Sequence, residues 1–278
     1  PQTPRARQAM RRVRRLYERG ILTSAVLTPW LARAALRLVR DAEATLVVDS
    51  TRCVRWEIFT AGVRWHGRVL PVAWQVLAYP WPKRQFTPTA TAVVDQVMRH
   101  WPPDRPVHLV ADRGFPSRAW FRCLDQWRAV LPLGYTIRLR AGDWVRLGSG
   151  VVVRLKDYLL AVPRPAGSWQ AQPAAYQQAR HTSEPATLVT GQGLACVPRH
   201  RAGPADQALR QARAQRRRAH VESKRQPQAA QTDSLWVLLT TLGSWRPAVQ
   251  RYADRFATEG TYRDFKTWDL ERVVAHES

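Results

Sequence analysis

Two aspartates stand where the chain could perform chemistry with paired carboxylates. Asp49 follows the apolar run 45–48, and Asp112 follows a similar run, 107–111. Such short, continuous apolar runs are typical of strands buried on both faces. If the two strands are parallel neighbours, both carboxylates emerge at one sheet edge, where open α/β sheets place their reactive groups. For either residue taken alone, a turn or helix cap is the commoner role and stays the alternative.

The last predicted helix begins near Arg246–Pro247 and carries a polar stripe. At about 100° per residue, one side of this helix collects two phenols, two cations and a carboxylate. These residues are Tyr252, Arg255, Glu259, Tyr262 and Lys266. Mixed charges at this spacing usually form a solvated face laced by salt bridges. The alternative is a stripe that borders a functional groove while the apolar side packs on a sheet.

The spacing Tyr252-x₂-Arg255-x₃-Glu259-x₆-Lys266 reproduces the Tyr-Arg-Glu-Lys signature of a large group of bacterial insertion-sequence transposases. That family has a retroviral-integrase-like (RNase H-like) catalytic core. The segment 47–51, around Asp49, resembles the family's first Asp motif, and the segment 110–115, around Asp112, resembles its second. The three motifs follow the family's order and bracket residues 45–270.

The resemblance implies a divalent-metal-dependent DNA transposase of the Asp-Asp-Glu type. Asp49, Asp112 and Glu259 would be both catalytic residues and ligands of two Mg²⁺ ions, with Mn²⁺ as a substitute, because hard cations prefer carboxylate oxygens. The enzyme would nick element ends and join their 3′-hydroxyls to target DNA by in-line phosphoryl transfer. Its expected partners are double-stranded DNA, as terminal inverted repeats and target, and a second copy of the chain.

The resemblance also implies roles in DNA binding. Tyr252, Arg255 and Lys266 would hold phosphates near the scissile bond, with a structural hydrogen bond or ion pair as the alternative for each. Arg113 and Arg263, next to these motifs, would neutralise the same DNA backbone.

Family members that form hairpin ends stack a flipped base on an aromatic residue of their insertion. Trp144 and Trp169 are the candidates for this role, and simple packing is the alternative for both. The chain departs from the family at Gly260, where a larger residue is usual. Because it begins at Pro1 and ends at Ser278, soon after the signature, we expect it to be a piece of a longer product.

Two other functions stay open. A catalytically inactive transposase fragment would act as a non-catalytic DNA-binding protein. An RNase H-like nuclease acting on RNA–DNA hybrids would need neither the basic first 42 residues nor the helix signature. The sequence contains no phosphate-binding loop, dinucleotide-binding glycine motif, paired cysteine motif or His-Glu-x₂-His motif, so nucleotide-hydrolysing and zinc sites lack support.

The order of the predicted elements indicates an α/β fold, and the resemblance implies an RNase H-like mixed five-stranded sheet flanked by helices. The first part of this catalytic core spans residues 43–142. It is predicted to contain strands at 45–49, 54–63, 68–77, 107–112 and 130–139, a turn at 50–52, a hairpin turn at Gly67, and helices at 87–101 and 117–128.

The remaining segments flank or interrupt this core. Residues 1–42 are predicted to form a basic, helical, DNA-contacting segment. Residues 143–232 are predicted to form a β-rich insertion and a basic linker, with short runs at 144–147, 151–155, 158–162 and 187–194. Residues 233–278 would complete the core with a strand at 235–242 and the signature helix.

Charge and composition favour a nucleic-acid partner. The 278 residues include 44 Lys and Arg against 21 Asp and Glu, a formal net charge of +23. Such an excess, mostly arginine, suits contact with phosphates. A hydrophobic fraction of 45% with 13 Trp allows a sizeable core, and no apolar stretch is long enough to cross a bilayer. With three widely spaced cysteines, we expect a cytoplasmic, nucleoid-associated bacterial protein.

Overall fold

The computed structural model describes residues 23–39, 41–53, 56–82, 84–161, 168–178, 181–192, 235–259 and 261–262. Its centre is one continuous mixed sheet with the strand order β3-β2-β1-β4-β5-β11-β10-β8-β6-β7, and β9 pairs with β8. The strands are β1 (Ala44–Cys53), β2 (Trp56–Trp65), β3 (Arg68–Ala78), β4 (Val107–Ala111), β5 (Leu133–Arg138), β6 (Trp144–Leu147), β7 (Val152–Arg154), β8 (Trp169–Gln178), β9 (His181–Thr182), β10 (Ala186–Gln192) and β11 (Leu235–Thr240). The predicted α/β class with a mixed sheet is confirmed.

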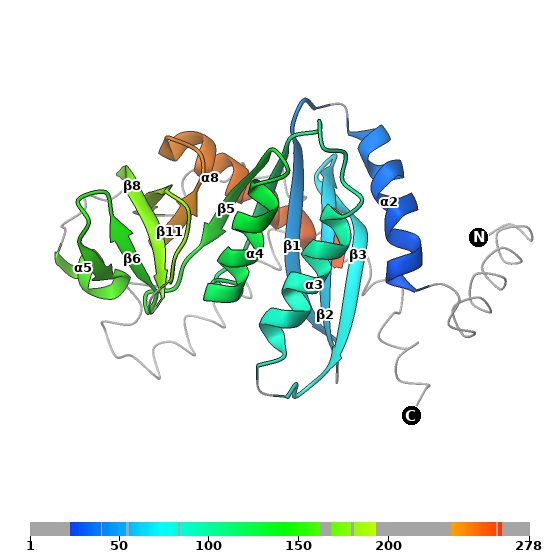
Figure 1. The fold of residues 1–278 in the computed structure, drawn as a ribbon, viewed down its shortest axis with the longest axis horizontal. Coiled ribbons are helices and arrows are strands. Elements are labelled where there is room, and N and C mark those ends of the chain that lie inside the picture. Colours follow the sequence, from blue (N-terminus) through cyan, green and yellow to red (C-terminus); the bar gives the residue numbers. More distant parts are fainter. Residues whose placement is uncertain are drawn as a thin grey trace, which may run out of the picture.

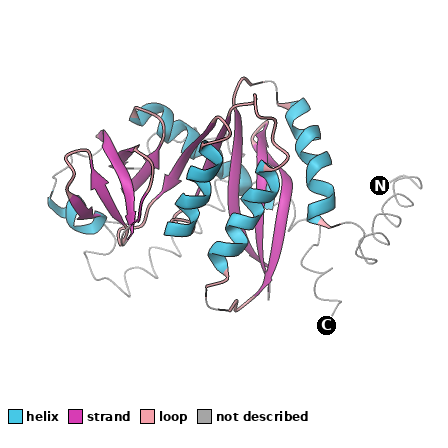
Figure 2. Ribbon diagram, viewed as in Figure 1, coloured by secondary structure: helices cyan, strands magenta, loops and turns pink. Residues whose placement is uncertain are grey.

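Helices cover both faces of the sheet. The helices are α2 (Ser24–Leu38), α3 (Phe86–Met98), α4 (Arg118–Arg128), α5 (Leu155–Ala161), α8 (Trp245–Ala253) and the 3₁₀ helix η1 (Asp254–Phe256). Figure 1 shows α3 and α4 in front of the first five strands, α2 beside β3 at the edge of the sheet, and α8 behind β5. The colouring by secondary structure in Figure 2 makes the same layers visible.

The strands β1, β2 and β3 form the predicted antiparallel meander. Its second connection is a two-residue turn at His66 and Gly67, whose φ angles of 43° and 74° are both positive. Two successive positive φ angles are the requirement of the hairpin turn that matches the twist of paired strands. The prediction that Gly67 makes this turn is therefore confirmed.

Strand β1 extends further than the sequence indicated. The predicted turn at residues 50–52 is wrong, because the strand continues to Cys53. The cause is its antiparallel partner, which pairs with β1 along its whole second half, from Ser50 opposite Phe59 to Cys53 opposite Trp56. Asp49 therefore lies inside a strand rather than at its end.

The strands of the predicted insertion extend the same sheet. Strand β11 pairs antiparallel with β5 on one side and with β10 on the other, so it connects the first five strands to β10, β8, β6 and β7. The five strands β3-β2-β1-β4-β5 are one part of this larger sheet. The predicted strand at 158–162 is wrong: Leu155, Tyr158 and Leu159 recur at helical spacing, and the segment forms α5.

The helix predictions hold in the first half of the chain. Helix α4 begins after Ser117, whose hydroxyl accepts a hydrogen bond from the Trp120 backbone N–H at 3.2 Å. Helix α3 spans most of the predicted 87–101 segment and ends at Met98. Helix α2 lies within the segment 1–42 that was predicted to be helical, and it buries Thr28, Ala32 and Ala35. The Arg-rich stretch before it, residues 5–19, lies outside the described residues.

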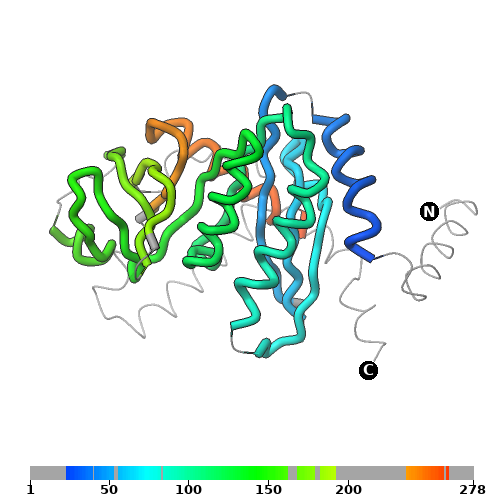
Figure 3. The backbone as a smooth tube through the Cα atoms, in the orientation of Figure 1, coloured from blue at the N-terminus to red at the C-terminus, as the bar shows by residue number. Residues whose placement is uncertain are grey.

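The C-terminal helical segment crosses the back of the sheet, as the tube in Figure 3 traces. Helix α8 packs on β5, β11 and β4, and η1 packs on β1. Beyond η1, the Thr261 hydroxyl bonds to the backbone N–H and carbonyl of Val69 on β3 at 2.9 and 3.2 Å. The segment thereby runs across the point where β1 and β4 lie side by side.

Among the described residues, no helix combines the length and the apolar composition that a membrane crossing requires.

Candidate active site

The sheet register brings the two predicted aspartates together. Strands β1 and β4 are parallel neighbours, and their last pair is Val48 opposite Ala111. The next residues are Asp49 and Asp112, and side chains in register on parallel neighbours point to the same face. The predicted meeting of the two carboxylates at one sheet edge is confirmed.

The same register adds a residue that sequence reasoning missed. Strand β5 is parallel to β4 and ends its pairing at Ile137 opposite Ala111, so Arg138 follows beside Asp112. The signal was available, because Arg138 is a charged residue at the carboxyl end of a predicted buried strand. A row of Asp49, Asp112 and Arg138 therefore crosses the sheet edge.

Helix α8 and its continuation place three further side chains on this row. The Tyr252 hydroxyl donates to Asp112 Oδ1 at 2.8 Å, and the Thr258 hydroxyl donates to Asp49 Oδ2 at 2.8 Å. Arg255 Nη1 lies 3.2 Å from Asp49 Oδ2 and 3.9 Å from Asp112 Oδ2. One guanidinium thus contacts both carboxylates.

The apolar side of α8 fixes the height of these groups above the sheet. Ala248, Val249 and Tyr252 are buried against Val110 of β4 and Trp236 of β11. The Tyr252 ring meets the Trp236 ring edge-on, with centroids 4.9 Å apart. The packed ring carries its hydroxyl to Asp112, so Tyr252 of the polar stripe faces the sheet edge.

The 3₁₀ turn η1 explains which residue of the stripe reaches Asp49. A 3₁₀ helix advances about 120° per residue, against about 100° in an α-helix, so three residues add about 60°. This rotation brings Thr258 to the direction expected for Arg255 and turns Glu259 away from it. Thr258 is buried and bonded to Asp49, whereas Glu259 is exposed. Sequence analysis missed Thr258 because it assumed a uniform helix.

Burial and charge act differently on the two carboxylates. Burial raises the pKa of Asp49 above its usual range, although Arg255, Thr258 and the Ser50 N–H favour its ionised form. Burial also disfavours ionisation of Asp112, but Arg255, the Arg113 N–H and Tyr252 outweigh it and lower its pKa. Asp112 therefore ionises at a lower pH than Asp49, although both belong to the same site.

Arg255 is itself buried and tightly held in its charged form. Its side chain is 12% exposed. Burial disfavours the cation, but Tyr252 and the carboxylates of Asp112, Asp49 and Glu259 raise the pKa of the guanidinium above its usual value. Its Nε is buried and has no hydrogen-bond partner among the described residues.

The third predicted carboxylate does not join the pair. Glu259 is exposed, and among the described residues no group of three His, Cys, Asp or Glu side chains could hold a metal ion. Lys266, Arg263 and Gly260, which the sequence analysis also singled out, lie outside the described residues. Two of the three predicted metal ligands are therefore assembled.

The assembled donors suit a hard divalent cation. Asp49 and Asp112 supply carboxylate oxygens from adjacent strands, with side chains 13% and 29% exposed. Mg²⁺ is commonly held by one or two carboxylates together with phosphate oxygens of its substrate. The chemistry of the pair thus fits a divalent cation, and Glu259 lies apart from the pair with its side chain exposed.

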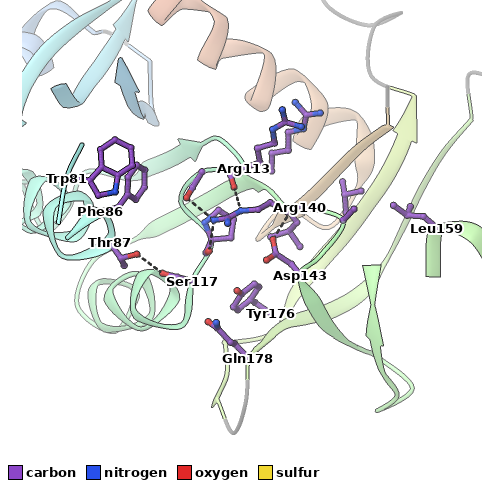
Figure 4. Close-up of a pocket in the computed structure, with 16 residues that line it drawn as sticks. Trp81, Phe86, Thr87, Arg113, Ser117, Arg140, Asp143, Leu159, Tyr176 and Gln178 are labelled. Atoms are coloured by element: carbon purple, nitrogen blue, oxygen red, sulfur yellow. Dashed lines mark hydrogen bonds between the residues drawn. The ribbon is translucent and has the colours of Figure 1, made fainter. Parts of the chain in front are cut away.

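Arg113 and Arg138 line a basic cavity of about 880 Å³ (Figure 4). Arg113 follows Asp112 in the chain, and Arg138 belongs to the row at the sheet edge. Arg140 donates to the backbone carbonyls of Arg113, Gly114 and Pro116 at 2.6, 3.0 and 3.3 Å. Arg140 therefore fixes the loop that follows Asp112.

The two tryptophans proposed for base stacking differ in environment. Trp169 stacks on Trp245 with ring centroids 5.9 Å apart, and meets Trp236 edge-on. Its packing ties β8 to the start of α8. Trp144 is 47% exposed at the start of β6.

Comparison with known proteins adds no relative. No protein-family model matches the sequence, and no curated protein matches it.

Proposed function

We propose that the chain is the catalytic part of an insertion-sequence DNA transposase, with strands β3-β2-β1-β4-β5 forming an RNase H-like core. The observation that carries the proposal is the pair of carboxylates, Asp49 and Asp112, on adjacent parallel strands. Tyr252 and Arg255 of the Tyr-Arg-Glu-Lys signature contact this pair from one helical segment. The sequence motifs and the spatial site therefore support one another.

In this proposal Asp49 and Asp112 hold divalent cations, and Glu259 is the third ligand. A bound pair of Mg²⁺ ions would activate the attacking oxygen and stabilise the leaving oxygen of a phosphodiester. Tyr252 orients the Asp112 carboxylate, and Thr258 orients that of Asp49. Arg255 supplies positive charge where the scissile phosphate would lie.

The expected substrate is double-stranded DNA, at terminal inverted repeats and at a target. The excess of 44 Lys and Arg over 21 Asp and Glu supports a polyanionic partner. Arg113 and Arg138 extend positive charge from the carboxylates along the sheet edge. A homodimer on DNA is part of the proposal, because two element ends have to be brought together.

A second candidate is a non-catalytic DNA-binding protein. The contact of Arg255 with both carboxylates and the exposure of Glu259 favour it, since a fixed cation can stabilise such a pair without a metal. The two candidates share DNA binding and differ in metal-dependent cleavage.

The test is nicking of supercoiled plasmid DNA in Mg²⁺ or Mn²⁺, with EDTA as the blank. We expect nicking by the parent protein and its loss in Asp112→Asn and Asp49→Asn. Asp104→Asn is the matched control, because it removes one carboxylate from an exposed turn before β4. DNA affinities of all four proteins are measured in parallel.

The nicking and binding results together distinguish the two candidates. Metal-dependent nicking that survives in Asp104→Asn but not in the other variants supports the transposase. Tight DNA binding without nicking in any protein supports the non-catalytic alternative. Nicking that persists in Asp112→Asn would refute the carboxylate site.

A further inference from the structure

Arg255 contacts both carboxylates of the candidate active site through a single nitrogen atom. Its Nη1 lies 3.2 Å from Asp49 Oδ2 and 3.9 Å from Asp112 Oδ2. Carboxylate oxygens are also the ligands that a divalent cation would use in this pair. A cation shared by Asp49 and Asp112 therefore competes with the Arg255 guanidinium for the same two oxygens.

The charge of Arg255 opposes a second cation at this place. The two carboxylates carry two negative charges when both are ionised, and the guanidinium neutralises one of them. Arginine keeps its charge throughout the physiological pH range. Repulsion between like charges is stronger in a largely buried site than in water, and the Arg255 side chain is only 12% exposed. Arg255 in its present position therefore lowers the affinity of the pair for divalent cations.

The two carboxylates do not depend on Arg255 for their orientation. Asp49 accepts hydrogen bonds from the Thr258 hydroxyl at 2.8 Å and from the next backbone N–H at 2.9 Å. Asp112 accepts a hydrogen bond from the Tyr252 hydroxyl at 2.8 Å. If the guanidinium left, both carboxylates would stay oriented, with one more uncompensated negative charge between them. The pair would then attract a divalent cation more strongly.

The guanidinium of Arg255 has a donor left for an anion. Its Nε is buried and has no hydrogen-bond partner among the described residues, whereas its contacts with the carboxylates are made by Nη1. Arginine presents its N–H groups in a planar fork that can bond a phosphate through two parallel contacts. A phosphate of the substrate would therefore offer Arg255 a bidentate partner in exchange for its present contacts.

The backbone position of Arg255 suits such an exchange. Arg255 belongs to the 3₁₀ turn η1, between α8 and the helical residues 257–259. A 3₁₀ stretch inside a helix has poorer hydrogen-bond geometry than an α-helix and often marks a hinge. A change confined to this turn would leave the packing of α8 against Val110 of β4 and Trp236 of β11 intact.

We infer that Arg255 couples metal binding to DNA binding. In the absence of DNA, its guanidinium neutralises Asp49 and Asp112 and keeps their affinity for divalent cations low. When a phosphodiester binds beside the carboxylates, Arg255 transfers its contacts to the phosphate, and the freed pair binds the metal. The coupling is reciprocal, so bound metal also raises the affinity for DNA. The inference rests on the proposed function for its metal site and its substrate.

The first test measures Mn²⁺ binding to the full chain without DNA, from the electron paramagnetic resonance signal of the free ion. We expect Arg255→Met to bind Mn²⁺ about 5- to 150-fold more tightly than the parent, the usual size of coupling between two ligands. Arg251→Met is the matched control, because it removes an arginine one turn earlier that pairs with Glu43. Its Mn²⁺ affinity should equal that of the parent.

The second test uses the parent protein, so it does not depend on the folding of Arg255→Met. Mn²⁺ binding is measured with and without a short DNA duplex. Asp112→Asn with the same duplex gives the background from ions bound to the DNA itself. We expect the duplex to raise the Mn²⁺ affinity of the parent above this background. The increase should be smaller in Arg255→Met, because its carboxylates are already free of the guanidinium.

Three results would overturn the coupling. The first is an Arg255→Met protein, folded by circular dichroism, that binds Mn²⁺ no more tightly than the parent. The second is a parent protein whose Mn²⁺ affinity does not change with the duplex, and the third is an equal increase in the parent and in Arg255→Met.

Failure of the coupling and failure of the proposed function are distinguishable. If plasmid nicking occurs as expected but one of these three results is found, the coupling is wrong and the transposase stands. If Mn²⁺ binding responds to Arg255→Met and to the duplex as expected but no protein nicks DNA, the coupling stands and the catalytic proposal is wrong.

Discussion

Arg255 is the residue on which the charge balance of the site depends. Its guanidinium contacts two largely buried carboxylates that belong to different strands. Removal of one partner from a buried ion pair costs about 3–5 kcal/mol, because the remaining charge is left uncompensated. Arg255 of η1 therefore links β1 and the end of β4 through ion pairs with Asp49 and Asp112.

We expect Arg255→Met to lower the free energy of unfolding at neutral pH by about 3 kcal/mol. The loss should shrink in acid, because protonation of the two carboxylates in the variant removes their mutual repulsion. Urea unfolding across this pH range measures both effects. Arg37→Met, at an exposed position on α2, is the control and should change stability by less than about 0.5 kcal/mol. Equal losses in the two variants would contradict this role of Arg255.

The two aspartates should affect stability with opposite signs. The folded-state pKa of Asp112 lies below its ordinary 3.8, so its ionised form stabilises the fold above that pH and this contribution disappears in acid. The folded-state pKa of Asp49 lies above 3.8, so its ionisation costs stability as pH rises past that value.

At pH 7 we therefore expect Asp112→Asn to lower the melting temperature and Asp49→Asn to raise it. The Asp49→Asn difference should narrow as the pH falls toward 3.8, because the folded-state pKa of Asp49 lies above that value. The Asp112→Asn difference should narrow only below 3.8, because the folded-state pKa of Asp112 lies below it. Thermal unfolding monitored by circular dichroism measures them. A lower melting temperature for Asp49→Asn at pH 7 would mean that its contacts with Arg255 and Thr258 outweigh the cost of burial.

At the scale of elements, the strands that carry the aspartates were predictable, and the helix that completes the site was only partly so. The apolar runs before Asp49 and Asp112 are local signals, and both form parallel strands, although β1 continues past Asp49 to Cys53. The 3₁₀ turn at Asp254–Phe256 carries no comparable signal in the sequence. This turn changes the direction in which the following side chains point. Thr258 therefore reaches Asp49, and Glu259 does not.

The errors in strand prediction have a common cause. Strand β1 continues past Asp49 because β2 pairs with it, and β8 forms although its sequence is rich in Gln and Ala. Both depend on pairing with another strand, which is the neighbouring β2 for β1 and the more distant β10 and β6 for β8. Local composition therefore identified isolated elements but not the continuous sheet.

The start of α4 gives a test at this scale. Ser117→Ala should lower the free energy of unfolding by about 1 kcal/mol, because it removes the oxygen that accepts the Trp120 N–H. Ser117→Asp keeps an acceptor at the same position and should restore the stability. Chemical denaturation measures all three proteins. A Ser117→Ala protein as stable as the parent would show that the cap contributes nothing measurable.

At the scale of the whole molecule, the net charge of +23 sets the behaviour toward DNA. Each neutralised phosphate lowers the logarithm of the binding constant by about 0.9 per tenfold rise in salt. We expect duplex affinity to fall roughly 10³- to 10⁵-fold between about 50 and 200 mM salt, as for a protein with about 6–10 phosphate contacts. Fluorescence anisotropy at several salt concentrations measures the slope. An affinity insensitive to salt would contradict a phosphate-contacting surface.

The continuous sheet places the candidate site near the middle of the molecule. Strand β11 joins the first five strands to the rest, and α8 packs across that junction on β5 and β11. The stripe residues Tyr252 and Arg255 are thus held by packing on both sides of the junction. Elements from both halves of the chain are needed to build one site.

The most direct test of the central claim, that Asp49 and Asp112 form a metal site, is iron-dependent cleavage of the protein itself. Fe²⁺ bound in place of Mg²⁺ would reduce added hydrogen peroxide to hydroxide and a hydroxyl radical, and added ascorbate would return the resulting Fe³⁺ to Fe²⁺. The radicals cut the backbone close to the ion. We predict fragments ending near residues 49 and 112, suppressed by excess Mg²⁺ and missing from Asp112→Asn. Fragments at unrelated positions, or the same pattern in Asp112→Asn, would contradict the account.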